Sequence, residues 1–151
     1  MSRVQLALNV ADLDAAVAFY RKLFGAEPAK LRPGYANFAI AEPPLKLVLI
    51  EGQGTPGTVN HLGIEVGSTG EVAEARARLA SEGLAPAVED GVACCYALQD
   101  KVWVDAPDGE AWEIYTVLAD VEMAAGLLRD VGPGADALCC AAAPESAARC
   151  C

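Results

Sequence analysis

The chain has 151 residues, of which 54% are hydrophobic, and its 21 acidic and 11 basic side chains give a formal net charge of −10. This length suits one domain, or two small modules that share one core. The acidic excess repels polyanions, so we expect neither a nucleic acid nor an anionic membrane as a partner. The chain shows no apolar run long enough to span a membrane and no secretory leader, which predicts a cytoplasmic protein.

The first third of the chain predicts a strand, a helix and further strands. Residues 4–10 alternate as a strand does, and Asp12 can cap the helix that follows. Gly25 ends that helix. Strands are expected at 35–41 and 45–51. The helix carries apolar side chains at helical spacing, namely Leu13, Ala16, Val17, Phe19, Tyr20, Leu23 and Phe24.

The pattern then repeats from about residue 58. Segment His61–Val66 matches Gln5–Val10 position for position: a polar residue, then Leu, small, aliphatic, polar and Val. Ser68 or Thr69 caps a second helix, and Gly83 closes it. The strands expected after this helix are 86–93, 95–105 and 111–118, the last two joined across Pro107-Asp108-Gly109.

Two such repeats predict an α+β fold of two tandem βαβββ modules. The modules cover about 1–52 and 58–118, within one domain of residues 1–120. Beyond it, residues 121–151 are rich in Ala, Gly and Cys, and we expect this tail to fray from the domain.

Alignment of the repeats brings three candidate metal ligands together. Gln5 and His61 take the same position on the first strand of each module, and Glu113 lies on the closing strand of the second. The position equivalent to Glu113 in the first module is Val48. Imidazole, carboxylate and amide oxygen suit Fe(II), Mn(II), Ni(II) or Zn(II), and three protein ligands leave positions open for substrate and oxygen or water. Taken singly, each has an ordinary explanation as a core histidine, a polar strand residue or a solvent-facing acid.

The six cysteines form three adjacent pairs, and a disulfide between neighbours requires a strained ring. This pattern indicates thiols that meet a soft metal or metalloid. Two successive residues cannot face the same side of a regular strand, so we expect a loop or bulge at the first pair, where both sulfurs can reach one acceptor. A trivalent arsenic with one carbon and two exchangeable hydroxyls fits two thiols. The tail pairs are either metalloid scavengers or an appendage without a role. The pairs are Cys94-Cys95, Cys139-Cys140 and Cys150-Cys151.

The stretch from Asp12 to Pro28 resembles the first helix of the vicinal oxygen chelate superfamily, which includes glyoxalase I, extradiol dioxygenases and bleomycin-resistance proteins. This resemblance implies the paired-module fold around a metal or ligand cavity. Over residues 1–120 the chain is similar to ArsI-type carbon–arsenic lyases and CadI-type proteins. The segments that carry this closer similarity are Pro33–Ile40, Pro44–Leu49, Asn60–Gly63, Cys94-Cys95 and Gln99–Val104.

The closer resemblance implies a non-haem Fe(II) enzyme that uses dioxygen to cleave the carbon–arsenic bond of trivalent organoarsenicals, such as methylarsonous acid, to arsenite. Position by position, Gln5, His61 and Glu113 match metal ligands, and Cys94 and Cys95 match arsenic-binding thiols. Ni, Co, Zn or Mn are alternative occupants of the metal site. The implied partners are the organoarsenical and dioxygen, and a monomer or homodimer is expected.

Two other functions compete with this one. Thiol-based sequestration of cadmium, arsenite or antimonite without catalysis is favoured by six thiols in a short chain. A glyoxalase-like isomerase or lyase explains the metal residues but not the cysteines, and Val48 in place of a fourth ligand disfavours it. Relative to extradiol dioxygenases, Gln5 replaces a histidine.

Overall fold

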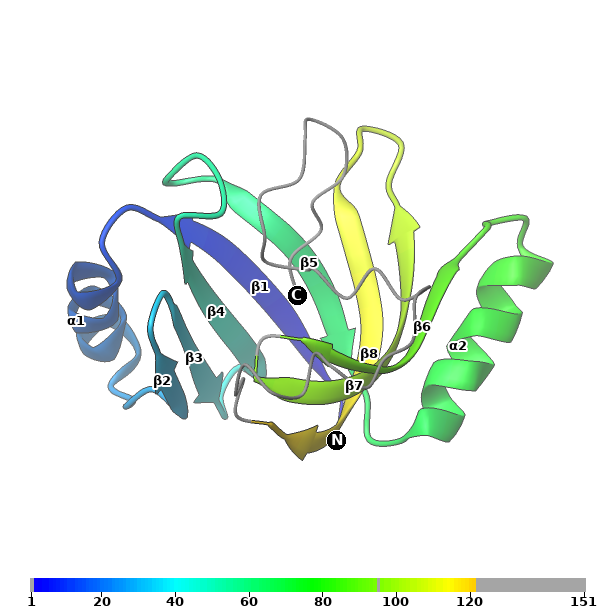
Figure 1. The fold of residues 1–151 in the computed structure, drawn as a ribbon, viewed down its shortest axis with the longest axis horizontal. Helices are drawn as coiled ribbons and strands as arrows, with labels where there is room; N and C mark the ends of the chain where they lie inside the picture. Colours follow the sequence, from blue (N-terminus) through cyan, green and yellow to red (C-terminus); the bar gives the residue numbers. More distant parts are fainter. Residues whose placement is uncertain (1, 95, 122–151) are drawn as a thin grey trace, which may run out of the picture.

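The computed structural model describes residues 2–94 and 96–121, which form one eight-stranded sheet and two helices. The sheet is strongly curled around a concave face, and the helices lie outside it at opposite ends (Figure 1). Neither helix in this part of the chain is long and apolar enough to cross a membrane. The helices are α1 (Leu13–Phe24) and α2 (Thr69–Ser81). The strands are β1 (Arg3–Val10), β2 (Lys30–Arg32), β3 (Tyr35–Ile40), β4 (Leu45–Glu51), β5 (Val59–Glu65), β6 (Ala87–Cys94), β7 (Ala97–Asp105) and β8 (Ala111–Asp120).

The strand order β2-β3-β4-β1-β5-β8-β7-β6 contains two βαβββ modules in series, as the repeat predicts. The ends of the predicted helices and strands agree with the structure to within two residues. One strand has no counterpart among the predicted ranges: β2, whose three residues are too few to establish an alternation. The predicted tail lies outside the described residues, apart from residue 121.

The modules meet where β1 and β5 pair antiparallel at the centre of the sheet. Each of these strands also pairs in parallel with the last strand of its own module. Ala7 pairs with Val48 across β1 and β4, and Gly63 pairs with Glu113 across β5 and β8. Since Ala7 and Gly63 are matching positions of the repeat, Val48 and Glu113 are equivalent, which confirms the alignment of the two modules.

The apolar core lies between the sheet and the helices. Helix α1 buries Leu13 and Val17 against β3 and β4, and α2 buries Val72 and Leu79 against β7 and β8. Not all apolar positions predicted for the first helix are buried: Phe19, one of them, is 58% exposed. Side chains alternate between the two sides of a strand. The opposite, concave side carries polar residues together with a smaller apolar cluster of Ala7, Tyr35, Val48 and Ile50.

Both helices begin at a side chain that accepts a hydrogen bond from the first turn. Asp12 Oδ1 accepts from the backbone N–H of Ala15 at 2.9 Å, and Ser68 caps α2 in the same way. Gly25, which ends α1, has a φ of 61°, a left-handed conformation that glycine adopts at little cost. The predicted start and end of α1 are thus confirmed.

We expect the substitution Asp12→Ala to lower the free energy of unfolding by about 1 kcal/mol and the melting temperature by roughly 4 °C, because it removes the acceptor for one exposed N–H group. Thermal denaturation followed by circular dichroism measures this. Asp14→Ala, within the first turn of α1, is the control and should cost less, since Asp14 only complements the helix dipole. Equal losses in the two variants would contradict the capping role.

Candidate metal centre

Three polar side chains from three adjacent strands meet on the concave face. Gln5 of β1, His61 of β5 and Glu113 of β8 are 3%, 2% and 1% exposed. Gln5 Nε2 lies 3.0 Å from His61 Nε2 and 2.5 Å from Glu113 Oε1. His61 Nε2 lies 3.4 Å from the same carboxylate oxygen. The structure therefore brings together all three residues that the sequence suggests as ligands.

Strand register explains why these residues converge. Gln5 lies opposite Gly63 on β5, and Gly63 lies beside Glu113 on β8. A Cβ atom on Gly63 would lie 2.9 Å from Glu113 Cγ and 3.4 Å from Gln5 Cβ. Glycine within a strand often marks such a close approach. Here the missing side chain is the space that the two flanking side chains share.

The spacing of the three donors fits a metal ion. Two donors bonded at right angles to a metal at about 2.1 Å are about 3 Å apart. The three separations, from 2.5 to 3.4 Å, scatter around that value. Among the described residues no three His, Cys, Asp or Glu side chains cluster, so the amide of Gln5 is needed as the third ligand. Such a mixed nitrogen and oxygen set suits Fe(II), Mn(II) and related ions.

The amide of Gln5 must turn over to serve as a ligand. Its Nε2 now donates to Glu113, and its Oε1 accepts a 2.5 Å hydrogen bond from the hydroxyl of Tyr115. An amide NH₂ group is a donor and does not ligate a metal, whereas the carbonyl oxygen does. A half-turn of the amide exchanges the two atoms. Tyr115 can accept from Nε2 as readily as it now donates, so its hydroxyl serves both orientations.

The outer atoms of the other two candidate ligands, His61 and Glu113, also have partners. Asn60 Oδ1 lies 2.7 Å from His61 Nδ1, which leaves Nε2 directed at the site. Lys101 Nζ lies 3.4 Å from Glu113 Oε2 and is fully buried. Partners of this kind orient ligands and tune metal affinity. The rings of Trp103 and His61 meet edge to face with their centroids 5.5 Å apart, so Trp103 packs against the imidazole.

Burial and neighbouring charge oppose each other at Glu113. Burial alone would raise the pKa of its carboxyl, but hydrogen bonding from His61 and the charge of Lys101 outweigh it, so the pKa lies below the ordinary 4.5. The carboxylate therefore stays ionised, as a metal ligand must. Burial also raises the pKa of Tyr115 far above its ordinary range, so its hydroxyl keeps its proton.

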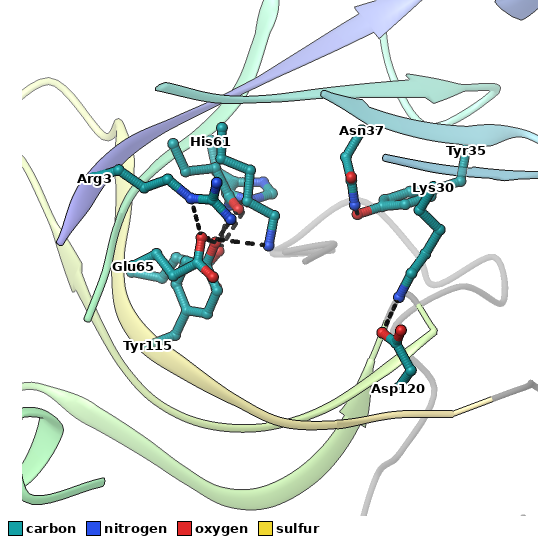
Figure 2. A network of polar contacts seen from close by, with 11 residues as sticks. Arg3, Lys30, Tyr35, Asn37, His61, Glu65, Tyr115 and Asp120 are labelled. Atoms are coloured by element: carbon teal, nitrogen blue, oxygen red, sulfur yellow. Dashed lines mark hydrogen bonds and ion pairs between the residues drawn. The ribbon is translucent and has the colours of Figure 1, made fainter. Parts of the chain in front are cut away.

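A charged network lies near His61 on the same face (Figure 2). Arg3 Nε donates to Glu65 Oε2 at 2.6 Å, and Lys46 Nζ lies 3.9 Å from that oxygen. Lys46 also lies 4.9 Å from the centre of the Tyr115 ring. Burial lowers the pKa of Lys46. The network thus supplies positive charge close to the candidate ligands.

Of the first cysteine pair, the structure describes Cys94, which stands where β6 ends and the turn to β7 follows. Cys94 is the last residue of β6, and Tyr96 occupies the turn before β7 with a left-handed φ of 66°. Lys30 Nζ donates to the Tyr96 carbonyl at 3.0 Å, and the Tyr35 and Tyr96 rings lie 5.9 Å apart. The turn of the second module is therefore fastened to the edge of the first.

A salt bridge between Lys30 and Asp120 lies beside this contact (Figure 2). It joins β2, the edge strand of the first module, to the end of β8. The remaining predicted thiols lie outside the described residues. They are Cys95, Cys139, Cys140, Cys150 and Cys151.

Sequence reasoning did not single out Gly63, Lys101 or Tyr115. A glycine inside a predicted strand is a recognised sign of close backbone approach, so Gly63 carried a usable signal. Tyr115 lies two residues after Glu113 on β8, so the alternation of that strand places both on the same face. Lys101 lies on β7, the strand that pairs with β8. Their partners, however, come from other strands, which the linear pattern does not reveal.

We expect Gly63→Ala to weaken divalent metal binding at least tenfold, because the added methyl displaces Glu113 from its neighbours. Calorimetric titration of the purified protein with Mn(II) or Fe(II) under nitrogen measures this. Gly70→Ala is the matched control, since its Cβ would meet only Ser68 Oγ at 3.7 Å. Unchanged affinity in the Gly63 variant would show that the close approach is not needed.

The lowered pKa of Glu113 makes a prediction about acid stability. A depressed carboxyl pKa contributes stability that is complete above the ordinary value of 4.5 and is lost as pH falls through the folded-state value. In the metal-free protein, Glu113→Gln removes this contribution. Its unfolding free energy, from urea denaturation, should fall less steeply than that of wild type between about pH 5 and 3. Glu110→Gln, at an exposed position, should keep the wild-type slope.

Comparison with known proteins places the chain in a family. The model of the glyoxalase/bleomycin resistance protein/dioxygenase superfamily matches residues 3–114. The cadmium-induced protein CadI of Mycobacterium tuberculosis is 61% identical over 93% of both chains. The trivalent organoarsenical cleaving enzyme of Thermomonospora curvata is 62% identical over 81% of this chain and 82% of the relative.

A solved structure supports the fold independently. The Mn(II)-bound glyoxalase from Novosphingobium aromaticivorans matches with a TM-score of 0.57 and 23% identity, over 82% of this chain and 44% of that one. At this identity the likeness shows the fold alone. Together with the curled sheet and the extent of the sequence matches, it completes the assignment. The chain belongs to the glyoxalase/bleomycin resistance protein/dioxygenase superfamily, in the family of CadI and the trivalent organoarsenical cleaving enzymes.

Proposed function

We propose that the protein is an Fe(II)-dependent enzyme that uses dioxygen to cleave the carbon–arsenic bond of trivalent organoarsenicals, releasing arsenite. The observation that carries the proposal is the convergence of Gln5, His61 and Glu113 at one point on the concave face. Relatives named trivalent organoarsenical cleaving enzymes, at 62% and 41% identity, support the choice of reaction. Detoxification of organoarsenicals in the cytoplasm is the role that follows.

Cys94 and Cys95 capture the substrate in this scheme. Methylarsonous acid, CH₃As(OH)₂, reacts with two thiols: two As–S bonds replace the two As–O bonds, and the hydroxyls leave with the thiol protons as two molecules of water. The carbon remains attached to arsenic because the As–C bond does not exchange with thiols. The overall reaction, CH₃As(OH)₂ + O₂ → As(OH)₃ + CH₂O, balances in atoms. Arsenic stays trivalent, while the carbon loses four electrons and dioxygen gains them.

Gln5, His61 and Glu113 hold the metal, and Fe(II) bound there supplies the binding and activation of dioxygen. Three protein ligands leave coordination positions free, which a structural site of four would not. Val48, packed with Ala7, Tyr35 and Ile50, stands where a fourth ligand would be. An isomerase that needs four protein ligands is therefore disfavoured. Ni, Co, Zn or Mn remain alternative occupants.

The surrounding side chains keep the carboxylate of Glu113 ionised and hold the amide of Gln5 in place. Lys101 stabilises the ionised carboxylate of Glu113, and Tyr115 holds the amide of Gln5. Burial of all three ligands excludes bulk water, which strengthens electrostatic interactions within the site. We expect a monomer or homodimer.

The decisive experiment loads the full-length protein with Fe(II) under nitrogen, adds trivalent methyl- or phenylarsenical, and then admits air. Arsenic speciation should reveal arsenite only when both iron and oxygen are present. His61→Ala should reduce arsenite release to background because it removes a metal ligand, and Cys95→Ser should do so because it removes a thiol. Asn60→Ser should lower the rate less, since Asn60 contacts His61 at the outer nitrogen Nδ1 and its amide nitrogen pairs with Asn9, away from the metal. A wild-type rate in Cys95→Ser would contradict the scheme.

The same experiment tests sequestration as the second candidate function. The six thiols of the chain and a relative named cadmium-induced protein favour it. A sequestering protein would bind arsenite, antimonite or cadmium tightly and would consume no oxygen. Tight binding of the organoarsenical with no arsenite formed would move the function to sequestration and leave the thiol sites in place.

A further inference from the structure

One buried side-chain atom among the described residues lacks a hydrogen-bond partner: the carbonyl oxygen Oε1 of Gln99. Gln99 is 5% exposed, so water outside the protein does not satisfy this acceptor freely. Nearly all buried polar groups in folded proteins are hydrogen-bonded, and an exception calls for an explanation. A donor that binds from outside the described chain is such an explanation.

The position of Gln99 indicates where such a donor would lie. From Gln99 to Asp105 the pairing of β7 with β8 is uninterrupted, so alternate residues share one face. Lys101 on that face contacts Glu113, and Trp103 packs against His61. Gln99 is therefore on the concave face, on the same row as the side chains that border the candidate metal centre.

Gln99 also lies close to the end of β7 that follows Cys94 and the turn between β6 and β7. Ala97, two residues earlier, pairs with Cys94 at the end of β6. Two residues of a strand span about 6.6 Å. Gln99 thus lies on β7 midway between Ala97, which pairs with Cys94, and Lys101, which contacts the candidate ligand Glu113. A molecule bound at Cys94 that extends along β7 toward Glu113 would reach this acceptor on the way.

The chemistry of the proposed reaction identifies the donor. Once two thiols have replaced the hydroxyls of methylarsonous acid, arsenic carries no O–H group. The cleavage CH₃As(SCys)₂ + O₂ → HOAs(SCys)₂ + CH₂O replaces the As–C bond with an As–O bond. One oxygen atom of dioxygen becomes the new hydroxyl, and one methyl hydrogen becomes its proton. A hydrogen-bond donor thus appears on arsenic on the side that faced the metal.

We propose that Gln99 Oε1 accepts a hydrogen bond from the hydroxyl that arsenic gains when carbon leaves. This inference rests on the proposed function, because it needs an arsenical on Cys94 and Cys95. Gln99 is unpaired while the organoarsenical is bound and paired once arsenite has formed. An interaction made only late in a reaction stabilises that stage over the bound substrate, so Gln99 is a binding residue that discriminates arsenite from its organic precursor.

The test compares two probes on metal-free full-length protein under nitrogen, with Cys139, Cys140, Cys150 and Cys151 replaced by serine. Arsenite bound by two thiols keeps one hydroxyl, whereas phenylarsonous acid bound by two thiols keeps none. In Gln99→Met we expect the affinity for arsenite to fall about tenfold and the affinity for phenylarsonous acid to stay unchanged, by calorimetric titration. Gln99→Leu repeats the measurement if the methionine variant does not fold.

The matched control is Thr116→Val, which removes a buried hydroxyl from the opposite face of neighbouring β8 and should leave both affinities unchanged. Equal losses for the two probes, or no loss for either, would overturn the role of Gln99 but leave the proposed function standing. If the wild type binds neither probe, the proposed thiol site is itself wrong, and the inference falls with it.

Discussion

Gly63 lies between Gln5 and Glu113 on three neighbouring strands, and the absence of its side chain allows these two residues to meet. The centre of the sheet is rigid because β1 and β5 each pair on both sides. The candidate ligands are therefore fixed by backbone hydrogen bonds and not by mobile loops. A site built on paired strands holds its geometry more closely than one built on connections.

Burial makes this arrangement costly unless its charges are matched. Glu113, Lys101 and Lys46 are all nearly or fully removed from solvent on the concave face. An ionised group taken out of water is stable only with partners, and removal of one partner leaves the other unpaired. Lys101 and the imidazole of His61 supply such partners to Glu113. A divalent cation between the three ligands would add a further positive charge where the carboxylate already accepts hydrogen bonds.

The two modules have diverged in the use they make of one plan. Their backbones repeat the same order of strands and the same parallel pairing, yet Val48 is apolar where its equivalent Glu113 is charged. The first module instead contacts the turn between β6 and β7 of the second, through Lys30 and Tyr35, which both contact Tyr96. The second half carries two of the three candidate ligands, and the first carries the third and supports the turn that follows Cys94.

Patterns in the sequence predicted the repeated modules, the caps of α1 and the three candidate ligands, and left the cap of α2 open between Ser68 and Thr69. These features depend on alternation, capping residues and matching positions, all of which are local or periodic in the chain. The side chains that surround the candidate ligands could be identified only in the folded structure, since Tyr115 and Lys101 contact partners that strand register brings near. The folded structure likewise revealed β2, whose three residues are too few for alternation, and the unpaired oxygen of Gln99. Whether a buried atom has a partner depends on every strand that packs around it, and no segment of sequence records that sum.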